Sequence, residues 1–285
     1  MGGTPCAQPV DAAAQLGRRL GLGVDAPVVL RATNNVVVWL SPSPVVAKVS
    51  SGDRGRLGDE LTVARYLVER GAPVVAPAPG LPQVVHRYGE FDVTLWTYHP
   101  QEGRNAPSAT SVAMALHALH DALAEYPDRA TRAIPPYSLE LTEVRARLDD
   151  PSFARMLAPD DRQLLWTVLD TLPAELESRS PSRRVLHGSP HRLNVLTVDD
   201  DPRFIDFETI CSGPPEWDLA HLEAEVADAY PGEIDSDCMS MARTLVSAKT
   251  AAWCWDGLDT GPDMRRHAEH HLRQVRQAAG GGRGG

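Results

Sequence analysis

Valine-rich runs separated by turn residues predict an antiparallel sheet in the first hundred residues of the chain. Such runs alternate with Gly, Pro, Asn and Ser clusters, a pattern typical of strands joined by hairpins. The five predicted strands cover residues 28–33, 35–40, 45–49, 84–88 and 92–98. One segment, residues 57–70, has apolar residues at helical spacing and ends at Gly71-Ala-Pro. We therefore expect five strands and one helix in this region.

Helical spacing of apolar residues dominates the remainder of the chain. The predicted helices cover residues 111–125, 139–148, 160–178, 216–230, 240–251 and 264–278. Between them, residues 184–206 contain short β-type runs around a tight turn at 199–202. These patterns predict an α+β fold, with a β-rich domain over residues 1–98 and a helical domain over residues 99–278. We expect residues 279–285, which are mostly glycine, to form a flexible tail.

The composition narrows the class of protein. Hydrophobic content of 42% and charged content of 23% are typical of a soluble globular protein. The net charge of −10 argues against a nucleic-acid-binding protein, which needs a basic footprint, and favours a cationic substrate. No apolar run is long enough to span a membrane, and the first residues do not resemble a signal peptide. The four cysteines lack metal-ligand spacing, which predicts reduced thiols in the cytoplasm.

Two short polar segments are the strongest functional signal. The first is His187-Gly-Ser-Pro-His-Arg-Leu-Asn194, and the second is Asp206-Phe-Glu208. Two predicted strands and a tight turn join them, so we expect Asn194 and Asp206 to lie side by side. An amide oxygen and a carboxylate suit Mg²⁺, which takes oxygen ligands and keeps substrate phosphates as further ligands.

The spacing of these segments resembles the catalytic loop and metal-binding Asp of the protein-kinase-like superfamily. It is most similar to the aminoglycoside phosphotransferase and choline kinase branch, where the loop reads His-Gly-Asp, four residues, Asn, and the second segment reads Ile-Asp-Phe/Trp-Glu. Residues 213–220, Gly-Pro-Pro-Glu-Trp-Asp-Leu-Ala, resemble the family's next segment. The resemblance implies a two-lobed fold with a small β-rich N-lobe and a larger helical C-lobe. It also implies Mg²⁺-dependent transfer of phosphate from ATP or GTP to a hydroxyl of a small molecule.

The resemblance assigns roles to residues of the polar segments. Asn194 and Asp206 correspond to the metal ligands. Asp218 corresponds to the residue that begins a helix and supports the catalytic loop, a role that also suits an Asp at a helix start. His187 and Glu208 correspond to supporting positions in the two motifs.

Lys48 resembles the strand lysine that holds the α- and β-phosphates of the nucleotide. Taken alone, it also fits a lysine in solvent on an edge strand. Glu60 decides between these readings, because it lies on the apolar face of the predicted helix, where an unpaired charge is costly. We therefore expect Glu60 to pair with Lys48, as the family's lysine–glutamate pair does.

Two further segments fall where the family binds nucleotide. Asn34 and Asn35 occupy the turn that covers the phosphates in protein kinases, and Asn tolerates the positive φ of a tight turn. Phosphate contact and an ordinary hairpin turn both fit these residues. Trp96 and Tyr98 fall at the linker between lobes, where the family's adenine makes hydrogen bonds to backbone groups.

Ser189 occupies the position of the family's catalytic Asp, and it is a very poor base near neutral pH. General-base assistance is worth about 10²–10⁴ in rate, but phosphoryl transfer depends mostly on positioning and charge neutralisation. Three explanations compete: His191 serves as the base, the protein is a pseudokinase that binds nucleotide without turnover, or the Ser is an engineered change. We favour an active kinase, although family members often have a His at position 191 and its role there is open.

The acceptor is not readable from the sequence, since the family's acceptors include aminoglycosides, other antibiotics, choline, sugars and amino-acid-like compounds. Acidic residues follow the catalytic segments and fit either attraction of an amine-bearing acceptor or a solvated helix face. They are Glu208, Glu216, Glu223, Glu225 and Asp228.

Overall fold

The computed structural model describes residues 7–52, 54–127, 134–150, 157–180, 183–256 and 262–281. The chain packs as two compact units. The first comprises Met1–Ala133 and Leu193–Ile210, and the second comprises Ile134–Arg192 and Cys211–Gly285. These two units are defined by which residues pack together. The predicted boundary at residue 98 was defined by the change from strands to helices, and it stays a prediction. The class is α+β as predicted, with a β-rich N-terminal region and a helical C-terminal part.

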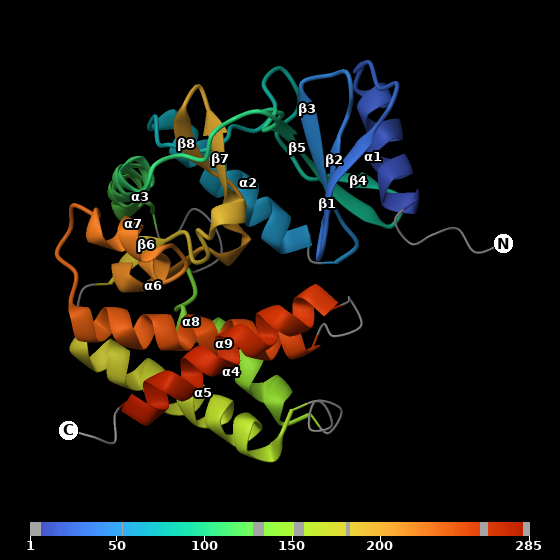
Figure 1. The fold of residues 1–285 in the computed structure, drawn as a ribbon. Helices are drawn as coiled ribbons and strands as arrows, with labels where there is room; N and C mark the ends of the chain where they lie inside the picture. Colours follow the sequence, from blue (N-terminus) through green and yellow to red (C-terminus); the bar gives the residue numbers. More distant parts are fainter. Residues whose placement is uncertain are drawn as a thin grey trace. The chain divides into compact units, whose positions relative to one another are not determined.

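The first unit contains a five-stranded antiparallel sheet in the order β1-β2-β3-β5-β4 (Figure 1). Its strands are Val28–Ala32, Val36–Trp39, Val45–Ser50, His86–Tyr88 and Phe91–Thr97, numbered β1 to β5. Each predicted strand is present, although β4 begins two residues later than predicted. Neighbouring residues of a strand point to opposite faces of the sheet, so the sheet has one face for the core and one for the site.

Helices α1 (Ala7–Arg19), α2 (Arg54–Glu69) and α3 (Ala109–Ala124) complete this part of the first unit. The prediction of a single helix before residue 98 is wrong, because α1 was not expected. Its buried face contains Ala13, Ala14 and Leu16, at helical spacing. These alanines pack in one core cluster with Val38, Ala47 and Leu95 of the sheet.

A hairpin from later in the chain also belongs to the first unit. It consists of β7 (Val195–Val198) and β8 (Asp201–Phe204), with short 3₁₀ turns η2 (Arg192–Asn194) and η3 (Phe207–Thr209) at its ends. The backbone N–H of Val75 donates to Phe204 O at 3.0 Å, and Phe204 N–H donates to Pro73 O at 2.8 Å. These bonds fix the end of β8, and therefore Asp206, against the segment that follows α2.

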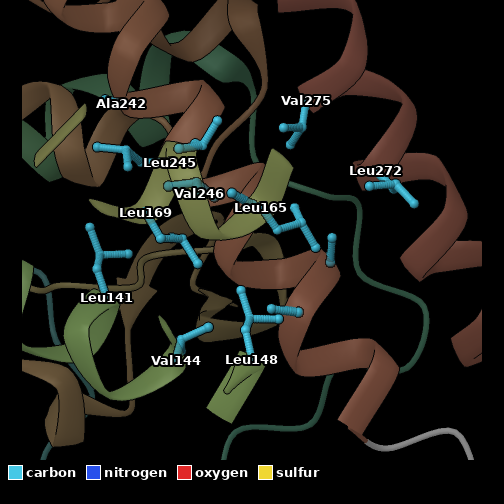
Figure 2. Packing of buried hydrophobic residues seen from close by; sticks show 14 of the residues in the cluster. Leu141, Val144, Leu148, Leu165, Leu169, Ala242, Leu245, Val246, Leu272 and Val275 are labelled. Carbon is cyan, nitrogen blue, oxygen red and sulfur yellow. The ribbon is translucent and has the colours of Figure 1, made fainter. Parts of the chain in front are cut away.

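The second unit is mainly helical. Its long helices are α4 (Ser138–Leu148), α5 (Pro159–Arg179), α8 (Ser236–Asp256) and α9 (Pro262–Gly281), and β6 (Arg184–Leu186) pairs with β9 (Cys211–Gly213). Figure 2 shows side chains from these helices in one buried hydrophobic cluster, for example Leu141, Leu165, Leu245 and Leu272. No described helix is long and apolar enough to cross a membrane.

Two predictions on the second unit need correction. The single helix expected over residues 216–230 is two short helices, α6 (Pro215–Leu219) and α7 (Ala224–Asp228). The backbone N–H groups of His221 and Leu222 donate to carbonyls three residues earlier, and such tightened turns end a helix. The start of the predicted tail, residues 279–281, is helical, and residues 282–285 lie outside the described residues.

Candidate functional site

The hairpin brings Asn194 and Asp206 together, as the sequence predicts. Ile205, the residue before Asp206, donates its backbone N–H to Asn194 O at 3.0 Å. Asp206 has φ 70° and ψ 66°, a left-handed conformation that is costly for a residue with a side chain. The fold therefore holds this carboxylate in one orientation, which is common at functional positions.

Lys48 lies at the centre of a carboxylate cluster within the first unit. Its Nζ is 2.9 Å from Glu60 Oε2 and 2.8 Å from Asp206 Oδ1, and it is also 2.7 Å from Glu208 Oε1. The predicted Lys48–Glu60 ion pair is present. The third carboxylate was expected only as a supporting group, and it is a direct partner of the lysine.

Burial and neighbouring charges shift the pKa values of Glu60 and Lys48 in this cluster. Burial raises the pKa of Glu60 to about 7, opposed by Lys48 and assisted by the negative charges of Asp206 and Glu208. Burial alone would lower the pKa of Lys48, but the three carboxylates outweigh it and raise that pKa. The excess of carboxyl groups contributes to both shifts, since three of them surround one ammonium group.

We expect Lys48→Met to destabilise the protein more above pH 7 than below it. Breaking a buried ion pair by removing one partner costs about 3–5 kcal/mol. Lys48 opposes the rise in the pKa of Glu60, which is about 7 in the wild-type protein. Without the lysine this pKa rises further, so the stability contributed by the protonated carboxyl is still being lost above pH 7 in the variant, where the wild-type protein has already lost it. Thermal unfolding of both proteins on either side of pH 7 measures this, and an equal loss at both pH values would contradict it.

The aromatic residues predicted at the linker lie on the site face of the sheet. Trp39, Val46 and Trp96 are direct cross-strand neighbours, and the Tyr98 ring stacks on Trp39 with centroids 4.4 Å apart. The backbone N–H of Tyr98 donates to Pro44 O at 3.0 Å. A nucleotide base at this position therefore cannot use that N–H without displacing its partner within the chain, and base contact with Trp96 or Tyr98 stays a prediction.

The turn at Asn34 and Asn35 differs from its expected geometry. Neither residue has a positive φ. Asn35 uses its side chain instead, donating from Nδ2 to Glu208 Oε1 at 2.7 Å. Asn34 is exposed. The turn is thus tied to the carboxylate cluster by a side chain, and phosphate contact by either Asn stays a prediction.

The loop that contains Ser189 lies in the second unit and is held by Asp218. Both oxygens of this buried carboxylate accept backbone hydrogen bonds, at 2.9 Å from His187 N and 2.8 Å from Gly188 N. Trp217 Nε1 donates to Gly188 O at 3.1 Å. Gly188 has φ 90°, a conformation that favours glycine. The backbone of the loop is therefore fixed by groups other than the residue at position 189.

Ser189 and His191 are both partly exposed on this loop. The backbone N–H of Ser189 is 3.4 Å from His187 Nδ1. Burial, and next the charge of Lys249, lower the pKa of His221 well below its usual value, and His191 adds to this shift. The structure thus places the predicted substitute base near a second histidine that stays neutral.

Sequence reasoning missed His221 and Lys249. His221 Nδ1 lies 2.8 Å from Trp217 O, so it carries the proton, and Nε2 accepts from Lys249 Nζ at 3.2 Å. Lys249 also pairs with Glu140 at 3.0 Å. The sequence did offer one indication of Lys249, because only two of its 28 lysine and arginine residues are lysines. In the structure both lysines are buried beside a glutamate.

The acidic residues after the catalytic segments divide into two groups. Glu208 contacts Lys48, and Glu216 is buried, with Oε1 accepting from Asp235 N at 3.2 Å. Glu223, Glu225 and Asp228 are exposed. Only the exposed three are placed to attract a cationic molecule from solvent.

Comparison with known proteins agrees with this geometry. Residues 17–270 match the model of the APH phosphotransferase enzyme family. The chain belongs to this family. Among curated proteins, no sequence matches the chain. Kinase-like solved structures have the same fold at low identity, and the family and fold together point to a small-molecule phosphotransferase.

Three solved structures illustrate the fold. Amicoumacin kinase, in complex with AMP-PNP, Ca²⁺ and amicoumacin, is 13% identical with a TM-score of 0.72, over 95% of each chain. A choline/ethanolamine kinase family protein from Mesorhizobium loti is 14% identical with a TM-score of 0.66, over 94% of each chain. The GDP complex of aminoglycoside 2′-phosphotransferase-IIIa is 13% identical with a TM-score of 0.66, covering 96% of this chain and 99% of the other.

The carboxylate cluster fits a hard divalent cation. Glu60, Asp206 and Glu208 each offer an oxygen, and these oxygens lie within 4.8 Å of one another. Oxygen-only donors suit Mg²⁺. The Lys48 ammonium group lies among them, so the same oxygens already balance a positive charge. The chemistry of the donor set is therefore consistent with a metal-bound nucleotide.

Proposed function

We propose that the protein is a Mg²⁺-dependent O-phosphotransferase that transfers the γ-phosphate of ATP or GTP to a hydroxyl of a small molecule. The observation that carries the proposal is the cluster of Lys48, Glu60 and Asp206 within one compact unit. Family membership supports the reaction class. Relatives of the same fold bind AMP-PNP with Ca²⁺, or GDP, which supports a nucleotide co-substrate with a divalent cation.

Each residue of the cluster has a chemical role in the proposed reaction. Lys48, oriented by Glu60, would neutralise phosphate oxygens of the nucleotide. Asp206 and Asn194 would hold Mg²⁺, which supplies charge neutralisation at the phosphates when bound. Phosphoryl transfer needs mainly positioning and electrostatic stabilisation. The chain therefore retains the groups that contribute most, even with Ser189 at the position of the family's base.

The acceptor is proposed to carry an amine as well as a hydroxyl. The net charge of −10 and the exposed carboxylates of Glu223, Glu225 and Asp228 favour a cationic molecule through long-range attraction. Phosphate transfer from ATP and from GTP across amine-bearing and neutral alcohols, followed by mass spectrometry, tests the proposal. Transfer to an amine-bearing alcohol is expected. Nucleotide binding with no transfer to any acceptor would favour the alternative below.

The alternative function is a pseudokinase that binds nucleotide for a regulatory or binding role. The observation that favours it is Ser189, which has no charge and cannot replace a carboxylate as base near neutral pH. The two functions differ in turnover and not in binding. An acceptor panel that includes aminoglycosides, choline, sugars and amino alcohols therefore discriminates between them.

His191 is proposed as the base in place of the family's Asp. His191→Ala is expected to lower kcat by about 10²–10⁴ and to leave nucleotide affinity nearly unchanged. In the wild-type protein, activity should fall as pH drops through the range in which an imidazole takes up a proton. Steady-state kinetics against pH measure both effects.

Restoring the carboxylate gives a control for this prediction. Ser189→Asp should rescue the His191→Ala protein, because it supplies the missing proton acceptor. Normal turnover by His191→Ala alone would show that Ser189 or a bound water suffices, and the base assignment would be wrong.

A further inference from the structure

Arg31 is a cation on the site face of the sheet, and the proposed function assigns it no role. Its Nη1 donates a hydrogen bond to Asn194 Oδ1 at 3.3 Å, and this amide oxygen is the one expected to bind the metal. Arg31 and Asn194 both lie in the first unit. The two expected metal ligands are therefore each in contact with a protein cation, because Lys48 contacts Asp206 at 2.8 Å.

A β-bulge places Arg31 on this face. Val29 is opposite Val38 and Arg31 is opposite Val37, so Leu30 is an extra residue in β1. A regular ladder would put Leu30 opposite Val37 and turn Arg31 toward the opposite face, where α1 packs against the sheet. Bulges are frequent next to active sites, where they redirect a side chain. The irregularity thus has a specific consequence, which is to aim a guanidinium at the site.

The register aligns Arg31 with Lys48 across the sheet. Arg31, Val37, Lys48 and Thr94 are successive cross-strand neighbours on β1, β2, β3 and β5. Direct neighbours in antiparallel strands share a face. Because strands are about 4.8 Å apart, the backbones at Arg31 and Lys48 are separated by about 10 Å. Arg31 lies farther from β5, and therefore farther from the expected position of the nucleotide base, than Lys48 does.

We propose that Arg31 is a second phosphate-binding cation, which contacts the terminal phosphate of a nucleoside triphosphate. This rests on the proposed function. When metal and nucleotide bind, Asn194 Oδ1 turns to the metal and the guanidinium of Arg31 moves to phosphate oxygens. Arginine suits this role because its planar fork binds phosphate through two parallel hydrogen bonds. The turn over the phosphates has no glycines to approach them by backbone N–H groups, and a long cationic side chain supplies the missing donors.

The charge balance of the cluster is consistent with this role. The cluster contains three carboxyl groups, Glu60, Asp206 and Glu208, and two cationic side chains, Lys48 and Arg31. Mg²⁺ held by Asp206 and Asn194 would release Arg31 from Asn194 and Lys48 from Asp206, while Glu60 keeps its contact with Lys48. A phosphate site with Lys48 as its only cation would instead leave Arg31 paired with an amide that the metal needs.

The test compares the affinities of triphosphate and diphosphate nucleotides. With Mg²⁺ present, the β,γ-imido analogues of ATP and GTP are titrated beside ADP and GDP by calorimetry. Arg31→Gln is expected to raise Kd for the triphosphate analogue roughly tenfold or more, since a hydrogen bond to a charged group is lost, and to leave Kd for the diphosphate nearly unchanged. Arg31→Lys should give an intermediate loss, because it retains the charge without the fork.

Arg65→Gln provides the matched control, since Arg65 is exposed on α2 and its loss should change neither affinity. A loss equal for triphosphate and diphosphate would assign Arg31 a structural role and overturn the inference, as would no loss. Thermal unfolding of Arg31→Gln separates a folding defect from a binding defect, and Arg31→Lys carries the test if Arg31→Gln does not fold. Failure of the wild-type protein to bind any of these nucleotides would instead overturn the proposed function, and the inference with it.

Discussion

Asp206→Asn is expected to abolish phosphate transfer and to remove the Mg²⁺ dependence of nucleotide binding. The substitution keeps the size of the side chain and removes the charge that is placed to bind the metal. It also removes one of the three carboxylates around Lys48. Because phosphoryl transfer depends on charge neutralisation by the metal, loss of this ligand should have a larger effect on rate than any other single change in the cluster. Turnover and calorimetry with and without Mg²⁺ measure both effects.

The β7–β8 turn offers a matched control for this change. Asp200 is exposed in the same hairpin and has a positive φ of 68°, a conformation that Asn also adopts readily. Asp200→Asn therefore makes the same change of charge in the same structural element, away from the cluster. It should leave turnover unchanged. Unchanged turnover in Asp206→Asn would contradict the metal-ligand assignment.

In the His191→Ala protein, Ser189→Asp is expected to raise turnover by about 10²–10⁴, the usual contribution of general-base assistance. The loop is prepared for the new carboxylate, because Asp218 and Trp217 already fix its backbone through His187 and Gly188. Position 189 is partly exposed, so the new charge avoids full desolvation. The gain should appear in kcat, with nucleotide affinity nearly unchanged.

Ser189→Asn separates charge from shape in this experiment. It has nearly the same size as Asp and no basic carboxylate, so it should give none of the gain. If Ser189→Asp leaves kcat at the value of the His191→Ala protein, a carboxylate at position 189 does not act as the base, and the correspondence with the family's base would be wrong for this chain.

The sequence predicted those parts of the site that depend on local pattern. The Lys48–Glu60 pair followed from helical spacing, because a glutamate on an apolar helix face needs a cation. The proximity of Asn194 and Asp206 followed from two strands joined by a tight turn. In both cases local structure limits the possible positions of the side chains. The helical period sets the direction of Glu60, and the short hairpin sets the distance between Asn194 and Asp206.

Features that depend on tertiary register were not predictable in this way. The β-bulge that redirects Arg31 is a mismatch between two strands, and no residue in Val-Val-Leu-Arg-Ala marks it. Contact of Glu208 with Lys48 depends on where the hairpin packs. The Lys249–His221 contact joins residues 28 positions apart, one in α8 and one in the turn after α6. The scarcity of lysine in the chain was the one available signal for that contact.

Calorimetric titration of the wild-type protein with ATP and GTP, each with and without Mg²⁺, tests the central claim most directly. The claim is that Lys48, Glu60 and Asp206 form a metal–nucleotide site. We expect saturable binding of at least one nucleotide that requires Mg²⁺ and is lost in Asp206→Asn. Binding that is independent of Mg²⁺, or no binding of either nucleotide, would contradict it.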